Sequence, residues 1–225
     1  MNQTFISWSG GKDCCLACYQ AMADGLDIRY LANMLTEDGT HSRTHGLSVE
    51  VLQLQSRAIG IPLLQRKATW GTYEDEFKKL LRSFKQEGIT DGVFGDIDLD
   101  EHREWVERVC NSVGITPHLP LWGKRQDEIL KHFISLEFEA VVIATKADML
   151  GDEWLGRRID IDFINRLTGL DKTNNITPCG EAGEYHTLVI DGPIFQNRLE
   201  IQETRKVLRD GHWFFEIIGV DMGGA

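Results

Sequence analysis

The sequence lacks the features that would place it in a membrane or outside the cell. None of its apolar runs approaches the ~20 residues that a helix needs to cross a bilayer. Residues 1–12 have neither a basic start nor a long apolar stretch, so they do not resemble a secretory signal. We therefore expect a cytoplasmic protein without a membrane partner.

Basic side chains are also in deficit. The chain of 225 residues has 24 Lys and Arg against 35 Asp and Glu, a formal net charge of -11. Affinity for nucleic acids comes mainly from neutralising phosphates, so we do not expect a nucleic-acid partner. The apolar fraction of 42% is ordinary for a globular protein and argues against disorder.

The five cysteines are an odd number and do not form the even pattern of a disulfide framework. Cys15 and Cys18 have the C-x-x-C spacing, and His41 and His45 the H-x₃-H spacing. A whole predicted strand separates the two pairs, which is not the spacing of a zinc finger. Free buried thiols are the interpretation we favour. Redox or sulfur-transfer chemistry stays an alternative, because a helix N-terminus lowers the pKa of a thiol such as Cys14.

Two common nucleotide-binding motifs are missing. A Walker A loop needs a glycine where Ile6 stands, and the dinucleotide fingerprint G-x-G-x-x-G is absent. The chain has instead SGGKD at residues 9–13, between a predicted strand and a predicted helix. Adjacent glycines let the backbone approach a ligand, and a helix N-terminus attracts phosphate. Lys12 would add a charge, Ser9 a hydroxyl and Asp13 a ligand for Mg²⁺. A plain strand–helix turn is the alternative.

Apolar patterning predicts strands that alternate with helices. Strand-like runs lie at residues 4–8, 28–35, 61–64, 92–97 and 140–144, and helical spacing at 12–23, 48–59, 73–86, 101–113 and 127–136. This alternation indicates an α/β protein with a Rossmann-like, doubly wound parallel sheet.

The alternation of strands and helices ends near Lys146. Residues 198–207 and 212–220 are typical of antiparallel strands around an Asp-Gly turn at residues 210–211. We therefore predict two domains, a larger one at residues 1–147 that contains the glycine loop and a smaller α+β domain at residues 148–225.

The SGGKD loop resembles the pyrophosphate-binding loop S-G-G-x-D-[ST] of the ATP pyrophosphatases, the PP-loop or adenine-nucleotide α-hydrolase superfamily. Cys14 stands where this pattern has Ser or Thr, and a thiol is a weaker donor than a hydroxyl. PLWG at residues 120–123, WLGR at 154–157 and GEAGEYHT at 180–187 are similar to motifs of one branch, the diphthine–ammonia ligases. Ala182 and His186 depart from the last motif. The resemblance extends from about residue 5 to residue 190.

The resemblance implies an ATP-binding domain and a smaller domain that closes over the substrate. It implies that ATP adenylates the carboxylate of diphthine, a modified histidine of elongation factor 2, and that ammonia displaces AMP. The products would be an amide, AMP and pyrophosphate. From the resemblance and the chemistry of these residues together, we expect ATP to bind at Ser9, Gly10, Gly11, Lys12, Asp13, Cys14, His45 and Gly95 with Mg²⁺ on Asp13, and catalysis to depend on Lys12, Asp13, Arg157, Glu181 and Glu184.

Structural alternatives stay open for several of these residues. A solvated turn would explain Glu181 and Glu184, and an ion pair with Asp152 or Glu153 would explain Arg157. Two other functions also stay open: another ATP-pyrophosphatase-type enzyme, such as a tRNA-thiolating one, and a non-catalytic protein that binds adenine nucleotides. The sequence leaves the acceptor and the oligomeric state open, a homo-oligomer included.

Overall fold

The first part of the chain forms a parallel sheet with the strand order β3-β2-β1-β4-β5. The computed structural model describes residues 2–174 and 176–223. The order reverses at β1, which pairs with β2 on one side and β4 on the other. This is the predicted doubly wound arrangement. The strands are β1 (Gln3–Ser7), β2 (Asp27–Leu35), β3 (Leu63–Lys67), β4 (Asp91–Val93) and β5 (Thr116–His118).

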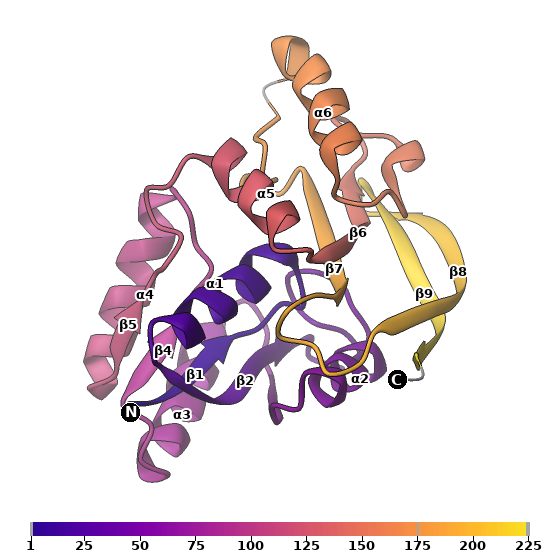
Figure 1. The fold of residues 1–225 in the computed structure, drawn as a ribbon. Helices are drawn as coiled ribbons and strands as arrows, with labels where there is room; N and C mark the ends of the chain where they lie inside the picture. Colours follow the sequence, from indigo (N-terminus) through magenta and orange to yellow (C-terminus); the bar gives the residue numbers. More distant parts are fainter. Residues whose placement is uncertain (1, 175, 224–225) are drawn as a thin grey trace.

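Helices cover both faces of this sheet (Figure 1). Leu16 of α1 and Leu52 of α2 belong to one buried cluster, and Phe77 of α3 and Val109 of α4 to another. In α3 the buried residues Phe77, Leu80, Leu81 and Phe84 follow the helical spacing that the sequence predicts. None of the described helices is long and apolar enough to cross a membrane. The four helices are α1 (Lys12–Ala23), α2 (Val49–Ile59), α3 (Tyr73–Gln86) and α4 (Asp100–Val113).

A second sheet has four antiparallel strands in the order β7-β6-β9-β8. The turn between β8 and β9 has Asp210 and Gly211 at φ of 48° and 75°, as the Asp-Gly signal predicts. The elements of this part are α5 (Gln126–Ser135), β6 (Glu139–Lys146), a short 3₁₀ helix η1 (Asp152–Trp154), α6 (Ile161–Asn174), β7 (Tyr185–Asp191), β8 (Leu199–Arg209) and β9 (His212–Met222).

The placement of the apolar run at residues 140–144 in the parallel sheet was wrong. This run forms β6, which pairs antiparallel with β7 and β9 in the second sheet. A continuous apolar run indicates that both faces of a strand are buried, but it does not identify the partner strands. The domain boundary at residue 147 stays a prediction, and strand membership favours a division between β5 and β6. The helix α6 was not predicted.

The two sheets share one core. A single buried cluster includes Trp8 and Leu52 from the first part and Val142 and Leu188 from the second. The second part therefore packs against the face of the parallel sheet that α1 and α2 cover. Figure 1 shows β7 beside the N-terminal end of α1.

Candidate active site

A cavity of about 700 Å³ lies where β1, β2 and β4 end. In open α/β sheets, ligands bind at the carboxyl ends of the strands where the strand order reverses, which here is between β1 and β4. The glycine loop and the first turn of α1 line one end of the cavity, aromatic side chains of α3 and α4 line the other, and the turn before β7 closes it. The loop and turn contribute Ser9, Lys12, Asp13, Cys14, Cys179, Gly180 and Glu181.

The glycine loop is packed tightly against its surroundings. Gly10 has a φ of 81°, and a Cβ there would lie 2.8 Å from a methyl carbon of Leu52. At Gly11 a Cβ would lie 2.7 Å from Cε1 of His45, and at Gly95 it would lie 3.0 Å from the backbone of α1. Glycine is therefore needed at these positions, because the glycine loop, the segment of His45 and the segment of Gly95 approach one another closely. These are the segments that the sequence associates with the nucleotide.

Lys12 joins the loop to the second part of the chain. Its side chain is 4% exposed, and Nζ lies 2.8 Å from Oδ2 of Asp13. Nζ also donates to the carbonyl oxygen of Cys179, and the ring of Tyr185 lies 5.2 Å away. Burial disfavours the ammonium, but Asp13, Tyr185 and Cys179 together outweigh it and hold the pKa of Lys12 above its usual value. Lys12 is therefore a fixed cation whose three nearest partners are protein groups.

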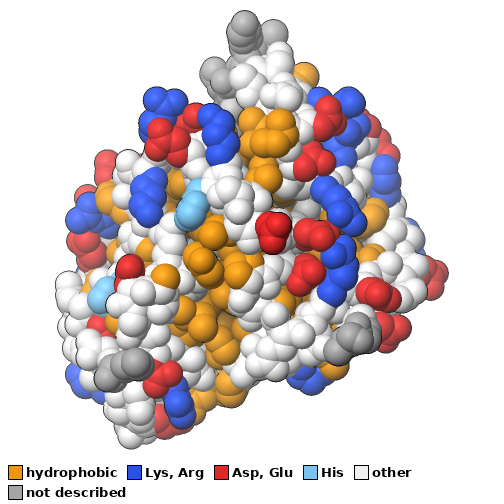
Figure 2. All heavy atoms as spheres, viewed as in Figure 1, with side chains coloured by type: hydrophobic (Ala, Val, Ile, Leu, Met, Phe, Trp, Pro, Cys, Tyr) orange, Lys and Arg blue, Asp and Glu red, His pale blue; other side chains and the backbone are white. Residues whose placement is uncertain are grey.

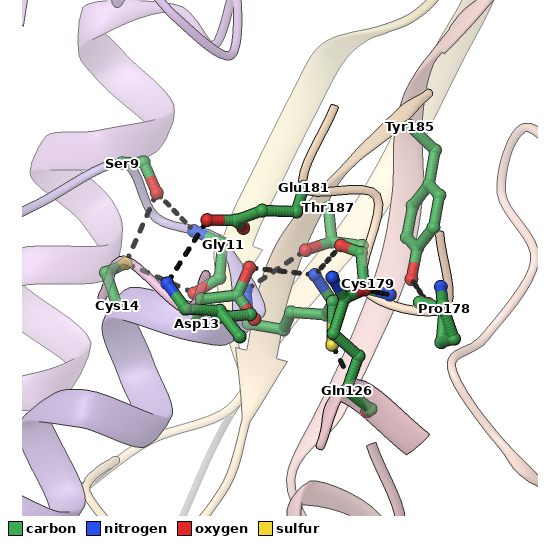
Figure 3. Close-up of polar contacts among 12 residues, drawn as sticks. Ser9, Gly11, Asp13, Cys14, Gln126, Pro178, Cys179, Glu181, Tyr185 and Thr187 are labelled. Atoms are coloured by element: carbon green, nitrogen blue, oxygen red, sulfur yellow. Dashed lines mark hydrogen bonds and ion pairs between the residues drawn. The ribbon is translucent and has the colours of Figure 1, made fainter. Parts of the chain in front are cut away.

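Two carboxylates of the cavity face each other across the boundary between the sheets. Oδ1 of Asp13 is buried and has no hydrogen-bond partner among the described residues. Glu181 extends from its turn toward the loop (Figure 3), and its Oε1 accepts from the backbone N–H of Ile97 at 3.2 Å. Burial and the nearby charge of Asp13 raise the pKa of Glu181 to about 7. Glu181 therefore exchanges a proton close to neutral pH.

The structure does not bring Glu184 and Arg157 into the cavity. Glu184 is fully buried, and its Oε1 accepts from the backbone N–H of Thr177 at 2.6 Å, so it fixes the turn that carries Glu181. The Nε of Arg157 donates to the carbonyl oxygen of Glu153 at 2.9 Å, and its guanidinium lies over Trp154. Neither residue lines the cavity. A motif gives their spacing, but the direction of each side chain depends on the packing around it.

Cys14 lies in the cavity wall at the start of α1. Its thiol donates to the carbonyl oxygen of Gly11 at 3.1 Å, and the hydroxyl of Ser9 donates to the sulfur at 3.4 Å. Burial opposes the thiolate, but hydrogen bonds from the side chains of Cys15 and Ser9 and from the backbone of the glycine loop outweigh it and hold the pKa of Cys14 below its usual value. Burial raises the pKa of Cys15 and Cys18 instead. All five cysteines are free and buried.

His45 lines the cavity in a stack with His186. The two rings lie 4.4 Å apart at an angle of 29°. Burial and the charge of Lys12 lower the pKa of His186 to about 4, and burial lowers the pKa of His45 well below its usual value. Both rings are therefore neutral at neutral pH, and Nδ1 of His45 has no hydrogen-bond partner in the described part of the chain.

Two family models divide the chain between them. The model described as the diphthamide synthase N-terminal domain matches residues 2–117, and the one described as the diphthamide synthase C-terminal domain matches residues 125–220. The chain belongs to the diphthamide synthase family. The boundary between the two matches falls between β5 and α5, which agrees with the division of the strands into two sheets.

The alignments with relatives cover most of the length of this diphthamide synthase family member. A diphthine–ammonia ligase of Danio rerio is 30% identical over 92% of this chain and 89% of its own. The enzyme of the same name from Rattus norvegicus is 26% identical over 96% and 89%, and that from Homo sapiens 28% over 92% and 85%. A solved structure described as a predicted subunit of tRNA methyltransferase from Methanocaldococcus jannaschii has a TM-score of 0.47 and 14% identity over 84% of this chain and 97% of its own. That likeness is too distant to bear on function.

One connection in this family member has no counterpart among the predicted site residues. Gln126, the first residue of α5, accepts from the backbone N–H of Cys179 at 2.8 Å and donates to Asp98 at 2.7 Å. It therefore holds the Glu181 turn against the loop after β4. A single glutamine at a helix start has no motif that would have indicated this.

The aromatic end of the cavity was also missed as a site. Tyr73, Phe77 and Trp105 form a contiguous group with ring centroids 5.4 to 6.3 Å apart. Trp70, which is 69% exposed, stands at the rim beside Tyr73. Helical spacing predicted that Phe77 lies in the core. It did not predict that the rings of this group face a cavity.

Proposed function

We propose that this protein is an ATP-dependent amide ligase that adenylates a carboxylate and lets ammonia displace AMP. The acceptor we propose is diphthine on elongation factor 2, or a related acid, because the relatives are named diphthine–ammonia ligases. The observation that supports the proposal best is that Glu181 faces the glycine loop within one cavity.

The glycine loop suits the phosphates of ATP. Ser9, Lys12 and Cys14 line the cavity where the N-terminus of α1 opens into it, and a helix N-terminus stabilises anions. In the proposed reaction a carboxylate oxygen attacks the α-phosphorus, the bond to the β-phosphate oxygen breaks, and pyrophosphate leaves. The positive charge of Lys12 would stabilise the negative charge of the departing pyrophosphate. Its ammonium also keeps Asp13 and the Cys179 turn in place.

Glu181 suits the second half of the reaction. Ammonia rather than ammonium attacks the acyl carbon, so the protein must bind ammonium and accept a proton from it. A carboxylate whose pKa is about 7 is ionised above that pH, where it binds the cation, and still basic enough to take the proton. The acyl–phosphate bond then breaks and AMP leaves with its electron pair, and the attacking nitrogen loses a second proton to solvent as the amide forms.

In this proposal Asp13 is the residue that would bind Mg²⁺. Carboxylate oxygens are preferred Mg²⁺ ligands, and Oδ1 of Asp13 is a buried oxygen without a partner among the described residues. Bound there, the ion would neutralise charge on the transferring phosphates.

The structure gives little support to a tRNA-thiolating function. The Cys14 thiol donates to the carbonyl oxygen of Gly11, which holds it in the turn. On the face shown in Figure 2, Lys and Arg side chains are interspersed with Asp and Glu rather than gathered in a basic patch. RNA backbone binding needs such a patch.

Product analysis tests the proposal. The protein is incubated with ATP, ammonium chloride and elongation factor 2 that carries diphthine, with unmodified elongation factor as the control acceptor. We expect AMP and pyrophosphate in step with conversion of the carboxyl group to an amide, observed by mass spectrometry. ADP as the main product, or AMP formation that does not depend on diphthine, would contradict it.

A further inference from the structure

Three metal-binding side chains meet at the edge of the cavity. Asp96 follows β4, His102 lies in the first turn of α4, and Glu181 lies in the turn before β7. Their ligand atoms all lie within 4.8 Å of one another. His102 also pairs with Asp96 at 3.2 Å, and the neighbouring backbone N–H of Ile97 holds Glu181 in place. Three elements that are distant in sequence therefore present one imidazole and two carboxylates to the same space.

The cavity has a deficit of positive charge. Its lining includes two basic side chains, Lys12 and Arg43, and three acidic ones, Asp13, Asp96 and Glu181. Lys12 is already paired with Asp13, and the guanidinium of Arg43 lies 4.6 Å from the ring of Trp70. Three carboxylates therefore face the cavity, while one of its two basic groups is already paired. Such crowding of like charges favours the binding of a cation.

A buried oxygen beside these ligands also lacks a partner. Oδ1 of Asp13 is closed to solvent and accepts no hydrogen bond from the described residues. The charges of Asp13 and Asp96 both act on Glu181, so the three carboxylates are close enough to interact electrostatically. An unpaired buried carboxylate oxygen is costly, and a bound cation nearby would stabilise it.

We propose that Asp96, His102 and Glu181 bind a divalent transition-metal ion of the Mn²⁺ type in the absence of nucleotide. Imidazole nitrogen favours such ions over Mg²⁺, which prefers an all-oxygen shell. The site takes ligands from both parts of the chain, so the ion holds the Glu181 turn against the end of β4. This goes beyond the ligase function, because the ion binds to the protein itself and not to ATP.

Titration with Mn²⁺ in nucleotide-free buffer, followed by electron paramagnetic resonance, tests the proposal. We expect one bound Mn²⁺ per chain, and a nitrogen coupling from His102 in the electron spin echo of the bound ion. His102→Asn and Glu181→Gln should each weaken binding about tenfold or more, and the first should remove the nitrogen coupling. His132→Asn, which changes an exposed histidine on α5, is the matched control and should leave both unchanged.

Thermal melting shows whether each variant is folded. Mn²⁺ should raise the melting temperature of the parent protein and of His132→Asn more than that of the two site variants. Unchanged Mn²⁺ affinity in both site variants, or Mn²⁺ binding only when ATP is present, would overturn the proposal and leave the ligase function standing. Binding as predicted together with ADP as the reaction product would instead overturn the ligase function alone.

Discussion

The backbone N–H of Lys12 donates to Oγ1 of Thr187 at 3.0 Å, although 175 positions separate the two residues. A helix leaves its first N–H groups without partners inside the helix. Gly11, the residue before α1, has no side chain to cap them, and a side chain of β7 does so instead. The conformation of the glycine loop therefore depends on the second part of the chain.

Thr187→Val should destabilise the protein by about 1–3 kcal/mol, because the buried N–H of Lys12 loses its acceptor. The control is Thr145→Val. Thr145 is equally buried, but its hydroxyl has no hydrogen-bond partner within the described residues, so this change should be neutral or stabilising. Urea unfolding of the two variants measures the difference. Equal stability of the two variants would contradict the role of Thr187.

Glu181 and Glu184 lie in one motif but should behave differently when changed to alanine. Glu181→Ala should lower the rate of amide formation and leave ATP affinity nearly unchanged, since its carboxylate faces the cavity. It should also cost some stability, because the N–H of Ile97 loses its acceptor. Glu184→Ala should cost about 1–3 kcal/mol of stability, because the N–H of Thr177 loses its partner. Turnover, calorimetric ATP binding and urea unfolding, measured side by side, separate the two effects. Full activity of Glu181→Ala would remove that residue from the proposed mechanism.

Local pattern was enough to predict much of the parallel sheet. The bounds predicted for α1 and α3 are those observed. In α3 the apolar residues lie at helical spacing, which is sufficient to define an amphipathic helix. The glycine loop was also predictable, because two adjacent glycines between a strand and a helix are a local pattern, although the contacts that require Gly10 and Gly11 come from distant residues such as Leu52 and His45. The sheet to which β6 belongs was not, because that depends on strands far along the chain.

The site was harder to predict than the fold. Glu181 and Glu184 are only three positions apart, yet one faces the cavity and the other is fully buried beneath the turn. Asp96, in the loop after β4, and His102, in the first turn of α4, meet Glu181 from the turn before β7. Such orientations depend on tertiary packing, which spacing along the sequence does not define.

Cys14→Ser should preserve ATP binding or tighten it by at most about 1 kcal/mol, and turnover should remain. A hydroxyl at this position can still donate to the carbonyl oxygen of Gly11, as the thiol does. A nucleophilic Cys14 would instead lose all turnover on the same substitution. Calorimetry with a non-hydrolysable ATP analogue and an activity assay distinguish the two, and lost activity with intact binding would contradict our interpretation.

The stack of His45 and His186 predicts how stability depends on pH. The pKa of His186 falls from 6.5 to about 4 in the folded protein, because burial, Lys12 and His212 all disfavour the charged ring. The unfolded chain therefore takes up a proton below about 6.5, and the folded protein does so only near 4. The contribution of His186 to stability is complete above pH 6.5 and is lost progressively as the pH falls toward 4, with a limiting slope of about 1.4 kcal/mol per pH unit for one proton.

His186→Phe keeps a ring against His45 and removes this titration. The stability of the parent protein relative to the variant should be constant above pH 6.5 and decrease as the pH falls toward 4. Taking the difference between two proteins cancels the acid sensitivity of the remaining carboxylates. His132→Asn serves as the control, since it changes a histidine that lies exposed on α5, and its difference should stay flat. Urea unfolding at half-unit steps of pH gives both curves. A flat difference for His186→Phe would mean that the ring is hydrated enough to protonate in the folded state, and that the stack is open to water.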